Sequence, residues 1–285
     1  MIEIEPGIYY SELYPGPTLG AIVLPSGIVF IDAPLRPEDG DIWKSNVLNR
    51  SHGAMQKLLV NLDSHPDRTI GSKAMLCNTL AQQKAAEKLY NRTSVFRGQL
   101  PESGSDWEKY PETNGIRWSP PNMTYTEKIE LHWGGPSVFV EHHPGPCPGA
   151  SWVIIPERKV AFVGDTVLQN APPFLANAHL PTWIESLDTL NSDFKNFTII
   201  SGRGGAVPHL LINKQLKSLK KLIKRIDRLA KKNAPPEAVS DLASALLDDF
   251  SPENKERETH LQRLRYGLYQ YYLKHYVSDE ELQEE

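Results

Sequence analysis

The sequence has few cysteines. Cys77 and Cys147 are the only two among 285 residues. Two thiols are too few for a disulfide framework, and they lack the paired spacing of zinc ligands. We therefore expect both to be reduced, as is usual for a cytoplasmic protein.

Long hydrophobic runs are also missing. No segment approaches the roughly 18 consecutive apolar residues that a transmembrane helix needs. The first residues carry Glu3 and Glu5 but no basic residue before an apolar stretch, which is unlike a signal peptide. We expect a soluble cytoplasmic protein with no membrane partner.

An excess of either charge is absent as well. The chain has 31 Lys and Arg against 35 Asp and Glu, a formal net charge of −4. Such a balance favours neither nucleic acids nor anionic membranes as partners of the whole chain. Any partner of that kind would need a local basic patch.

The chain is long enough for one large α/β domain, or for a smaller domain with an appendage. Short apolar runs bounded by turn residues predict several strands. They cover residues 2–4, 21–24, 28–31, 58–60, 138–140, 152–155, 160–163 and 197–200. The runs at 21–24 and 28–31 flank Pro-Ser-Gly and predict a hairpin.

Helical patterns alternate with these strands. We predict helices near residues 71–89 and 182–194, and a polar loop at 61–68 directly after a strand. The order of elements favours an α/β fold of the αββα type, in which two mixed β-sheets pack face to face between flanking helices. Sites in α/β folds usually lie where strands end, so the polar loop is a candidate.

The C-terminal part has a different character. Leu216, Leu219, Ile223 and Ile226 recur at three- and four-residue steps, which predicts an amphipathic helix ending at Pro235-Pro236. Further helices are expected at about 237–249 and 253–276. We thus predict a main domain over residues 1–208 and a helical extension over 209–285.

Four motifs occur in a distinctive order. They are Asp-Ser-His-Pro-Asp-Arg at 63–68, Pro-Gly-Pro-Cys-Pro-Gly at 144–149, Gly-Asp-Thr at 164–166 and Ser-Gly-Arg-Gly at 201–204. Together with the hairpin ending at Asp32-Ala33, they resemble the metallo-β-lactamase superfamily, whose motifs are His-x-His-x-Asp-His, Pro-Gly-His-x-Pro-Gly, Gly-Asp-Thr and Ser/Pro-Gly-His-Gly. The resemblance covers about residues 1–210 and implies the metallo-β-lactamase fold and hydrolase-like chemistry.

The resemblance also implies seven positions that would bind two metal ions. This sequence has the following residues there: Asp63, His65, Asp67, Arg68, Pro146, Asp165 and Arg203. A guanidinium stays protonated and proline has no side-chain donor, so three of these positions cannot bind a metal. Ordinary two-zinc hydrolysis is therefore not expected.

The two implied sites differ in what they keep. The first retains Asp63, His65 and Asp165, a set of ligands suited to one zinc, manganese or iron(II) ion. Asp67, His142 and His143 are further candidate ligands, since either histidine could replace the one missing at position 146. The alternative interpretation is that these two histidines lie at the protein surface or in a turn and bind no metal.

The second site has gained two arginines. We expect Arg68 and Arg203 to pair with Asp67 and Asp165 in place of the missing metal. In an enzyme, Asp67, Arg68 and Arg203 would be the catalytic residues, with an arginine binding an anionic group or an oxyanion. The alternative is a metal-free salt-bridge network in an inactive protein with a binding or structural role.

Three other residues near the motifs have two interpretations each. Cys147 is either a thiolate ligand or nucleophile, or a packed side chain. His179 and Trp183 would line a substrate pocket by analogy with relatives, although Trp183 has the character of a core residue.

The C-terminal helices raise the question of macromolecular partners. The amphipathic helix is rich in lysine and arginine between residues 214 and 232, but it has no interleaved aromatic residues, so we expect a solvated face and no nucleic acid. Tyrosines at 266–272 suit packing either onto the main domain or onto a second copy in a homodimer. The substrate or small-molecule ligand is not identified by the sequence.

Overall fold

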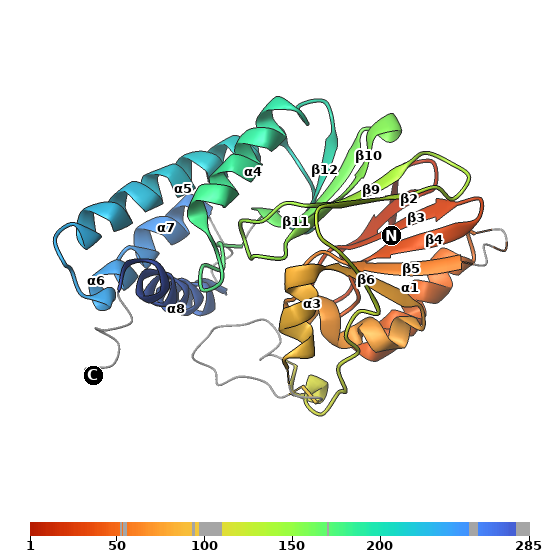
Figure 1. Ribbon diagram of the computed structural model, residues 1–285, viewed down its shortest axis with the longest axis horizontal. Coiled ribbons are helices and arrows are strands. Elements are labelled where there is room, and N and C mark those ends of the chain that lie inside the picture. Colours follow the sequence, from red (N-terminus) through yellow and green to blue (C-terminus); the bar gives the residue numbers. More distant parts are fainter. Residues whose placement is uncertain are drawn as a thin grey trace.

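The computed structural model describes residues 1–51, 53, 56–92, 95–96, 110–169, 171–250 and 256–277. Two β-sheets pack face to face, and helices cover their outer faces (Figure 1). This is the predicted αββα sandwich of two mixed sheets.

The first sheet has seven strands in the order β1-β2-β3-β4-β5-β6-β7. Its strands are β1 (Ile2–Glu5), β2 (Ile8–Ser11), β3 (Leu19–Leu24), β4 (Gly27–Ile31), β5 (Gln56–Asn61), β6 (Asn78–Gln82) and β7 (Met123–Tyr125). Neighbours from β1 to β4 are antiparallel, including the predicted β3–β4 hairpin, and those from β4 to β7 are parallel.

The second sheet has six strands in the order β13-β12-β11-β10-β9-β8. Its strands are β8 (Lys128–Leu131), β9 (Val138–His142), β10 (Ser151–Ile155), β11 (Val160–Leu168), β12 (Thr198–Arg203) and β13 (Gly205–Val207). Only the β11–β12 pair is parallel, so this sheet is mixed as well.

The helices lie between and after these strands. They are α1 (Pro37–Leu48), α2 (Pro66–Thr69), α3 (Gln83–Tyr90), α4 (Leu180–Ser192), α5 (His209–Ala230), α6 (Pro236–Ser240), α7 (Ala243–Phe250) and α8 (Arg257–Tyr276). Short 3-10 helices are η1 (Ile70–Met75), η4 (Pro111–Thr113) and η5 (Pro156–Arg158). None of the helices in the described part of the chain is long and apolar enough to cross a membrane.

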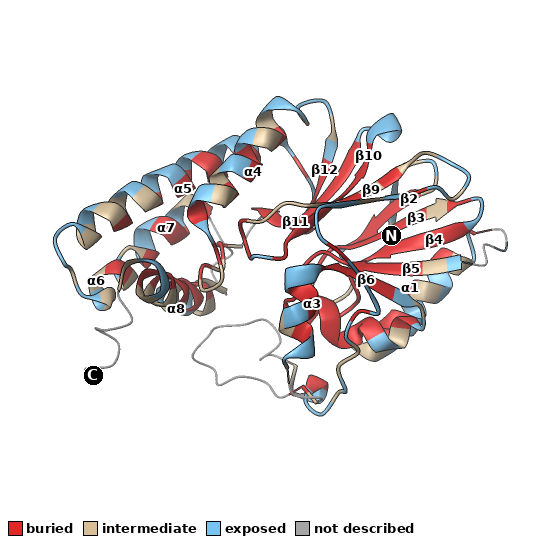
Figure 2. Ribbon diagram, viewed as in Figure 1, coloured by how far each residue is buried: buried red, intermediate tan, exposed pale blue. Residues whose placement is uncertain are grey.

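Alternation along the strands builds three apolar layers. In β4, Val29 and Ile31 pack between the sheets, whereas Ile28 and Phe30 point outward and pack with Trp43 of α1. In β10, Val153 belongs to the layer between the sheets, while its neighbours face the other side. Most strand residues are therefore buried on both faces of each sheet (Figure 2).

The C-terminal helices share an apolar cluster with the second sheet. Trp152 of β10 belongs to the same buried cluster as Leu219 of α5, Leu247 of α7 and Leu264 of α8. Because α5 begins at His209, the predicted boundary coincides with an element boundary. Whether residues 209–277 form a separate folding unit stays a prediction.

The single helix predicted over residues 71–89 is wrong. Leu76 has a left-handed backbone with φ of 51° after η1, and strand β6 precedes α3. Leu80 and Ala81 lie in β6 between two parallel strands and are fully buried. A short apolar run of this kind fits a buried strand as well as a helix, and here strand pairing decided the outcome.

The helix predicted over residues 237–249 is two helices, α6 and α7. Of the stretch predicted at 253–276, residues 253–255 lie outside the described residues, and the remainder corresponds to α8.

Candidate metal centre

The candidate centre lies where strands of both sheets end. Asp32 follows β4, and the loop after β5 carries Asp63 and His65. Asp165 lies in an irregular part of β11, and Arg203 ends β12. Since β4 and β5 are parallel, as are β11 and β12, carboxyl ends of strands from both sheets meet here.

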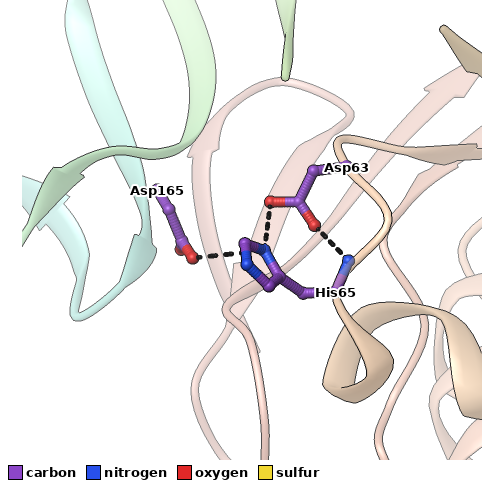
Figure 3. Close-up of side chains that lie close together, drawn as sticks. All are labelled: Asp63, His65 and Asp165. Atoms are coloured by element: carbon purple, nitrogen blue, oxygen red, sulfur yellow. Dashed lines mark hydrogen bonds and ion pairs between the residues drawn. The ribbon is translucent and has the colours of Figure 1, made fainter. Parts of the chain in front are cut away.

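Asp63, His65 and Asp165 form a compact group of metal-binding side chains. One potential ligand atom from each lies within 4.8 Å of the others, and all three residues are buried. The His65 ring lies between the two carboxylates (Figure 3), with its Nδ1 at 3.0 Å from Asp63 Oδ2 and 4.0 Å from Asp165 Oδ2. Asp63 Oδ1 accepts a hydrogen bond of 2.7 Å from the His65 backbone N–H, which fixes the loop.

Arg68 lies beneath this group and is fully buried. Its Nη1 donates to Asp32 Oδ2 at 2.5 Å, its Nη2 donates to Asp165 Oδ1, and its Nε lies 3.2 Å from Asp63 Oδ2. The expected pairing with Asp165 is present, but Asp32 and Asp63 are partners that the sequence did not predict. A guanidinium surrounded by carboxylates can remain charged in the interior.

Arg203 lies at the other side of the group. Its Nη2 donates to Asp67 Oδ2 at 2.6 Å, and its Nε lies 3.5 Å from Asp165 Oδ1. Asp67 is fully buried on α2, which begins at Pro66, whereas 12% of the Arg203 side chain is exposed. The expected carboxylate–guanidinium pairs are present on this side of the centre, and that they replace a metal ion stays a prediction.

Gly202 is required for the approach of these groups. A Cβ atom at this position would lie 2.6 Å from Arg68 Nη2 and 2.8 Å from Asp165 Oδ1. Any side chain would thus displace the ion pair. This steric restriction explains why glycine precedes Arg203 in the fourth motif.

The surroundings keep two of the acids ionised. Burial alone would raise the pKa of Asp63, but Arg68 and His65 hold that pKa well below its usual range. Burial of Asp165 is likewise outweighed by Arg203 and Arg68, so its pKa is lowered. Asp32 differs, because burial raises its pKa to about 7 despite the contact with Arg68.

The residues present fit one metal ion but not two. Two ionised carboxylates and an imidazole are suitable ligands, and the buried His65 Nδ1 has no partner with hydrogen-bond geometry among the described residues. Where a second ion would require ligands, the guanidinium groups of Arg68 and Arg203 lie against the carboxylates. A second cation would be repelled there.

The other candidate ligands lie elsewhere. His142 Nε2 contacts the Pro148 carbonyl oxygen at 2.8 Å. His143 stacks on Trp152 with ring centroids 3.6 Å apart, and its Nε2 contacts Glu141 Oε2 at 3.3 Å. Neither belongs to the group of Asp63, His65 and Asp165.

Cys147 is buried, and burial raises the pKa of its thiol. The environment is therefore opposite to the one that would make it a thiolate ligand or nucleophile. Of its two interpretations, the packed side chain fits the structure.

Trp183 is a core residue, as expected, and its Nε1 donates to the Thr166 carbonyl at 2.8 Å. His179 caps α4 by accepting from the Thr182 backbone N–H. It is exposed, and its ring contacts His275 of α8.

The basic residues of the amphipathic helix mostly face solvent. The exposed ones on and just after α5 are Lys214, Lys217, Lys220, Lys221, Lys224, Arg228, Lys231 and Lys232.

Sequence reasoning missed two residues that support the centre. Asp32 was visible as the acid that ends the hairpin motif, yet only the fold brings it to Arg68. Gln215 of α5 is buried, with Oε1 accepting from the Leu168 N–H at 3.0 Å and Nε2 donating to the Thr166 carbonyl at 2.8 Å. It thereby holds the backbone that follows Asp165, and nothing in its sequence context indicates this.

Comparison with known families identifies one match. The model of the metallo-beta-lactamase superfamily matches residues 84–228. A search of curated protein sequences finds no match.

Several solved structures are similar in fold. The stereoselective inverting sec-alkylsulfatase Pisa1 from Pseudomonas sp. superposes with a TM-score of 0.65 at 15% identity, over 98% of this chain and 51% of that one. The chain thus spans about half the length of that relative. A metallo-beta-lactamase from Pontibacter korlensis gives a TM-score of 0.55 at 14% identity, over 75% of this chain and 99% of the other.

Proposed function

The chain belongs to the metallo-β-lactamase superfamily, and on that premise we propose that it is a hydrolase with a divergent, single-metal site. Asp63, His65 and Asp165 would hold one divalent ion, either zinc, manganese or iron(II). The substrate would be an ester-like or phosphoester compound. The convergence of these three donors is the observation that carries the proposal.

Charge supports a cation at this position. Asp63, Asp67 and Asp165 are three carboxylates, whereas Arg68 and Arg203 supply two positive charges among them. One negative charge is therefore left over among these five side chains, and Asp32, a further partner of Arg68 whose pKa is raised to about 7, adds to it when ionised. A divalent ion would neutralise it.

The roles of the protein groups follow from their burial. A bound divalent ion supplies a Lewis acid and lowers the pKa of water. Arg203, partly exposed, would bind an anionic oxygen of the substrate, while Asp67 orients its guanidinium through the 2.6 Å hydrogen bond. Arg68 has no exposed surface, so it would position Asp63 and Asp165 without contacting a substrate.

A metal-free protein with a binding or structural role is the second candidate. Arg68 already contacts Asp63 and Asp165, two of the three donors. If these contacts satisfy the acids, they form a salt-bridge network that connects both sheets and catalyses nothing.

Elemental analysis decides between these candidates. The protein is purified without chelators or an affinity metal, alongside the double variant Asp63→Ala with His65→Ala. We expect about one metal ion per chain in the wild type and its loss in the double variant. His142→Ala with His143→Ala is the matched control and should retain the metal, because neither histidine belongs to the centre.

Absence of metal from the wild type, even after incubation with manganese, iron(II) and zinc, would support the metal-free candidate. If metal is bound, hydrolysis is measured on carboxylic esters, lactones, thioesters, phosphodiesters and a secondary alkyl sulfate. The last is included because a structural neighbour is a sec-alkylsulfatase. Metal-dependent turnover that the double variant lacks would support the proposed hydrolase.

A further inference from the structure

The centre opens into a small pocket whose other wall comes from the C-terminal helix α8. The pocket has a volume of about 20 Å³. Asp165 and Arg203 line it from the strands, Phe174 from the loop after β11, and His260 and Arg263 from α8. The candidate centre is therefore completed by a part of the chain far beyond the four motifs.

His260 and Arg263 are the basic residues of α8 that are buried. Their exposed fractions are 6% and 5%, whereas Arg265, two residues further on, is exposed. Residues three apart lie on the same face of a helix, so α8 directs both side chains toward the centre. Both side chains lie beside the pocket together with Asp165 and Arg203.

Phe174 fixes Arg263 relative to His65. The Arg263 guanidinium carbon lies 4.9 Å from the Phe174 ring centroid, and Tyr266 of the same helix stacks on this ring. The other neighbour of Phe174 is His65, whose ring meets it edge-on at 5.9 Å. One aromatic ring thus connects α8 with the candidate metal ligand.

Gly267 allows this close packing. A Cβ atom there would lie 3.0 Å from the backbone nitrogen of Leu175. The lack of a side chain therefore lets α8 approach the loop that carries Phe174.

Two further positive groups, Lys88 of α3 and Arg92 just after it, are close enough to interact electrostatically with the centre. Asp63 acts electrostatically on Arg92 and Lys88, and burial lowers the pKa of both side chains, that of Arg92 to about 10. Lys274 of α8 also acts on Lys88.

We propose that the pocket binds an oxyanion group of the substrate, through Arg203 on one side and Arg263 with His260 on the other. Guanidinium groups bind sulfate, phosphate and carboxylate through paired hydrogen bonds. Among the described residues that line the pocket, the acid is Asp165, which contacts Arg68 and Arg203. The pocket volume of about 20 Å³ is far below the roughly 300–1,000 Å³ of sites for drug-sized ligands, so the pocket has room for a single small anionic group and not for a larger ligand.

That the bound anionic group belongs to a substrate rests on the proposed hydrolase function, but anion binding itself can be measured without turnover. Binding of inorganic phosphate and of inorganic sulfate is measured by calorimetry on the metal-analysed full-length protein. Arg263→Met removes the charge and keeps an unbranched side chain against Phe174. Arg265→Met is the matched control on the exposed face of the same helix.

We expect the wild type to bind phosphate, sulfate or both, and Arg265→Met to bind the same ion with the same affinity as the wild type. Binding to Arg263→Met should be weaker by about tenfold or more, because a charge-assisted contact is lost. Circular dichroism checks the fold of each variant. If Arg263→Met does not fold, Arg263→Lys keeps a charge but loses the guanidinium fork, and it should still weaken binding.

Two results would overturn the inference: a wild type that binds neither ion, or a folded variant at position 263 that binds as tightly as the wild type. Failure of the hydrolase proposal is separate, because it shows as absent metal or absent turnover while anion binding persists. In an active enzyme, Arg263→Met should raise KM for an anionic ester more than KM for a neutral ester.

Discussion

The two arginines of the centre carry the same charge but lie in different surroundings. Arg68 is fully buried and contacts Asp32, Asp63 and Asp165. Arg203 keeps 12% of its side chain exposed, pairs with Asp67 and lines the pocket. The two arginines at the implied ligand positions therefore differ: one guanidinium lies among buried carboxylates, and the other is partly accessible to solvent.

The largest expected effect separates these roles. Arg68→Met should lower the free energy of unfolding by about 3–5 kcal/mol, because it leaves buried carboxylates without their cation. Arg203→Met should cost less, about 1–2 kcal/mol, since solvent reaches its site. Urea unfolding of both variants measures the difference. Equal losses of unfolding free energy in the two variants would contradict the different roles of Arg68 and Arg203. Unchanged stability and metal content in both variants would contradict the hypothesis that the arginines replace the second metal.

Variants of Asp32 test the contact with Arg68 that the sequence did not predict. Asp32→Ala should cost about 3 kcal/mol, because it removes a buried partner of Arg68 and places alanine at a left-handed φ of 57°. Asp32→Asn should cost less, because asparagine tolerates this backbone and resembles the neutral acid. Unfolding curves in urea give both values, and an asparagine variant as unstable as the alanine variant would contradict this account.

The contribution of Asp32 to stability depends on pH, and the direction of this dependence can be predicted. The pKa of Asp32 is raised to about 7 in the fold and lies near 3.9 in an unfolded chain. The stability associated with its bound proton is complete below pH 4 and is lost as pH rises through 7. Asp32→Asn should therefore gain stability relative to the wild type between pH 5 and pH 8. A constant difference would show that Asp32 is ionised throughout.

Gln215 tests whether the helical extension supports the strand that carries Asp165. Gln215→Leu keeps the volume but leaves the Leu168 N–H and the Thr166 carbonyl without this partner, at a cost of about 2 kcal/mol. Because these groups follow Asp165, the variant should also lose metal more readily to a chelator. Lys214→Ala, an exposed neighbour, is the control. Normal metal retention in a destabilised Gln215→Leu would limit the residue to a structural role.

Cys147 should give the smallest effect. Its raised pKa keeps it a thiol, so Cys147→Ala should retain metal content and any activity while losing about 1 kcal/mol of stability. Cys77→Ala is the control. A large loss of activity with normal folding would restore the nucleophile interpretation.

The sequence predicted the architecture because its signals are local. The hairpin at β3 and β4, the strands at β5 and β10 and the amphipathic helix α5 all follow from periodicity and turn residues. Strand β6 was missed because its short apolar run has no local mark that separates it from a helix. The predicted homodimer and cytoplasmic location stay predictions.

By itself, the sequence determined which donors and cations are available, since the four ordered motifs fix their identity. The tertiary structure decided which of them meet. Arg68 and Asp165 are 97 residues apart, and His260 and Arg263 lie on a helix outside every motif. Contacts of this kind arise from packing of strand ends and helix faces, which local spacing does not specify, so only the fold shows that α8 lines the pocket beside Asp165 and Arg203.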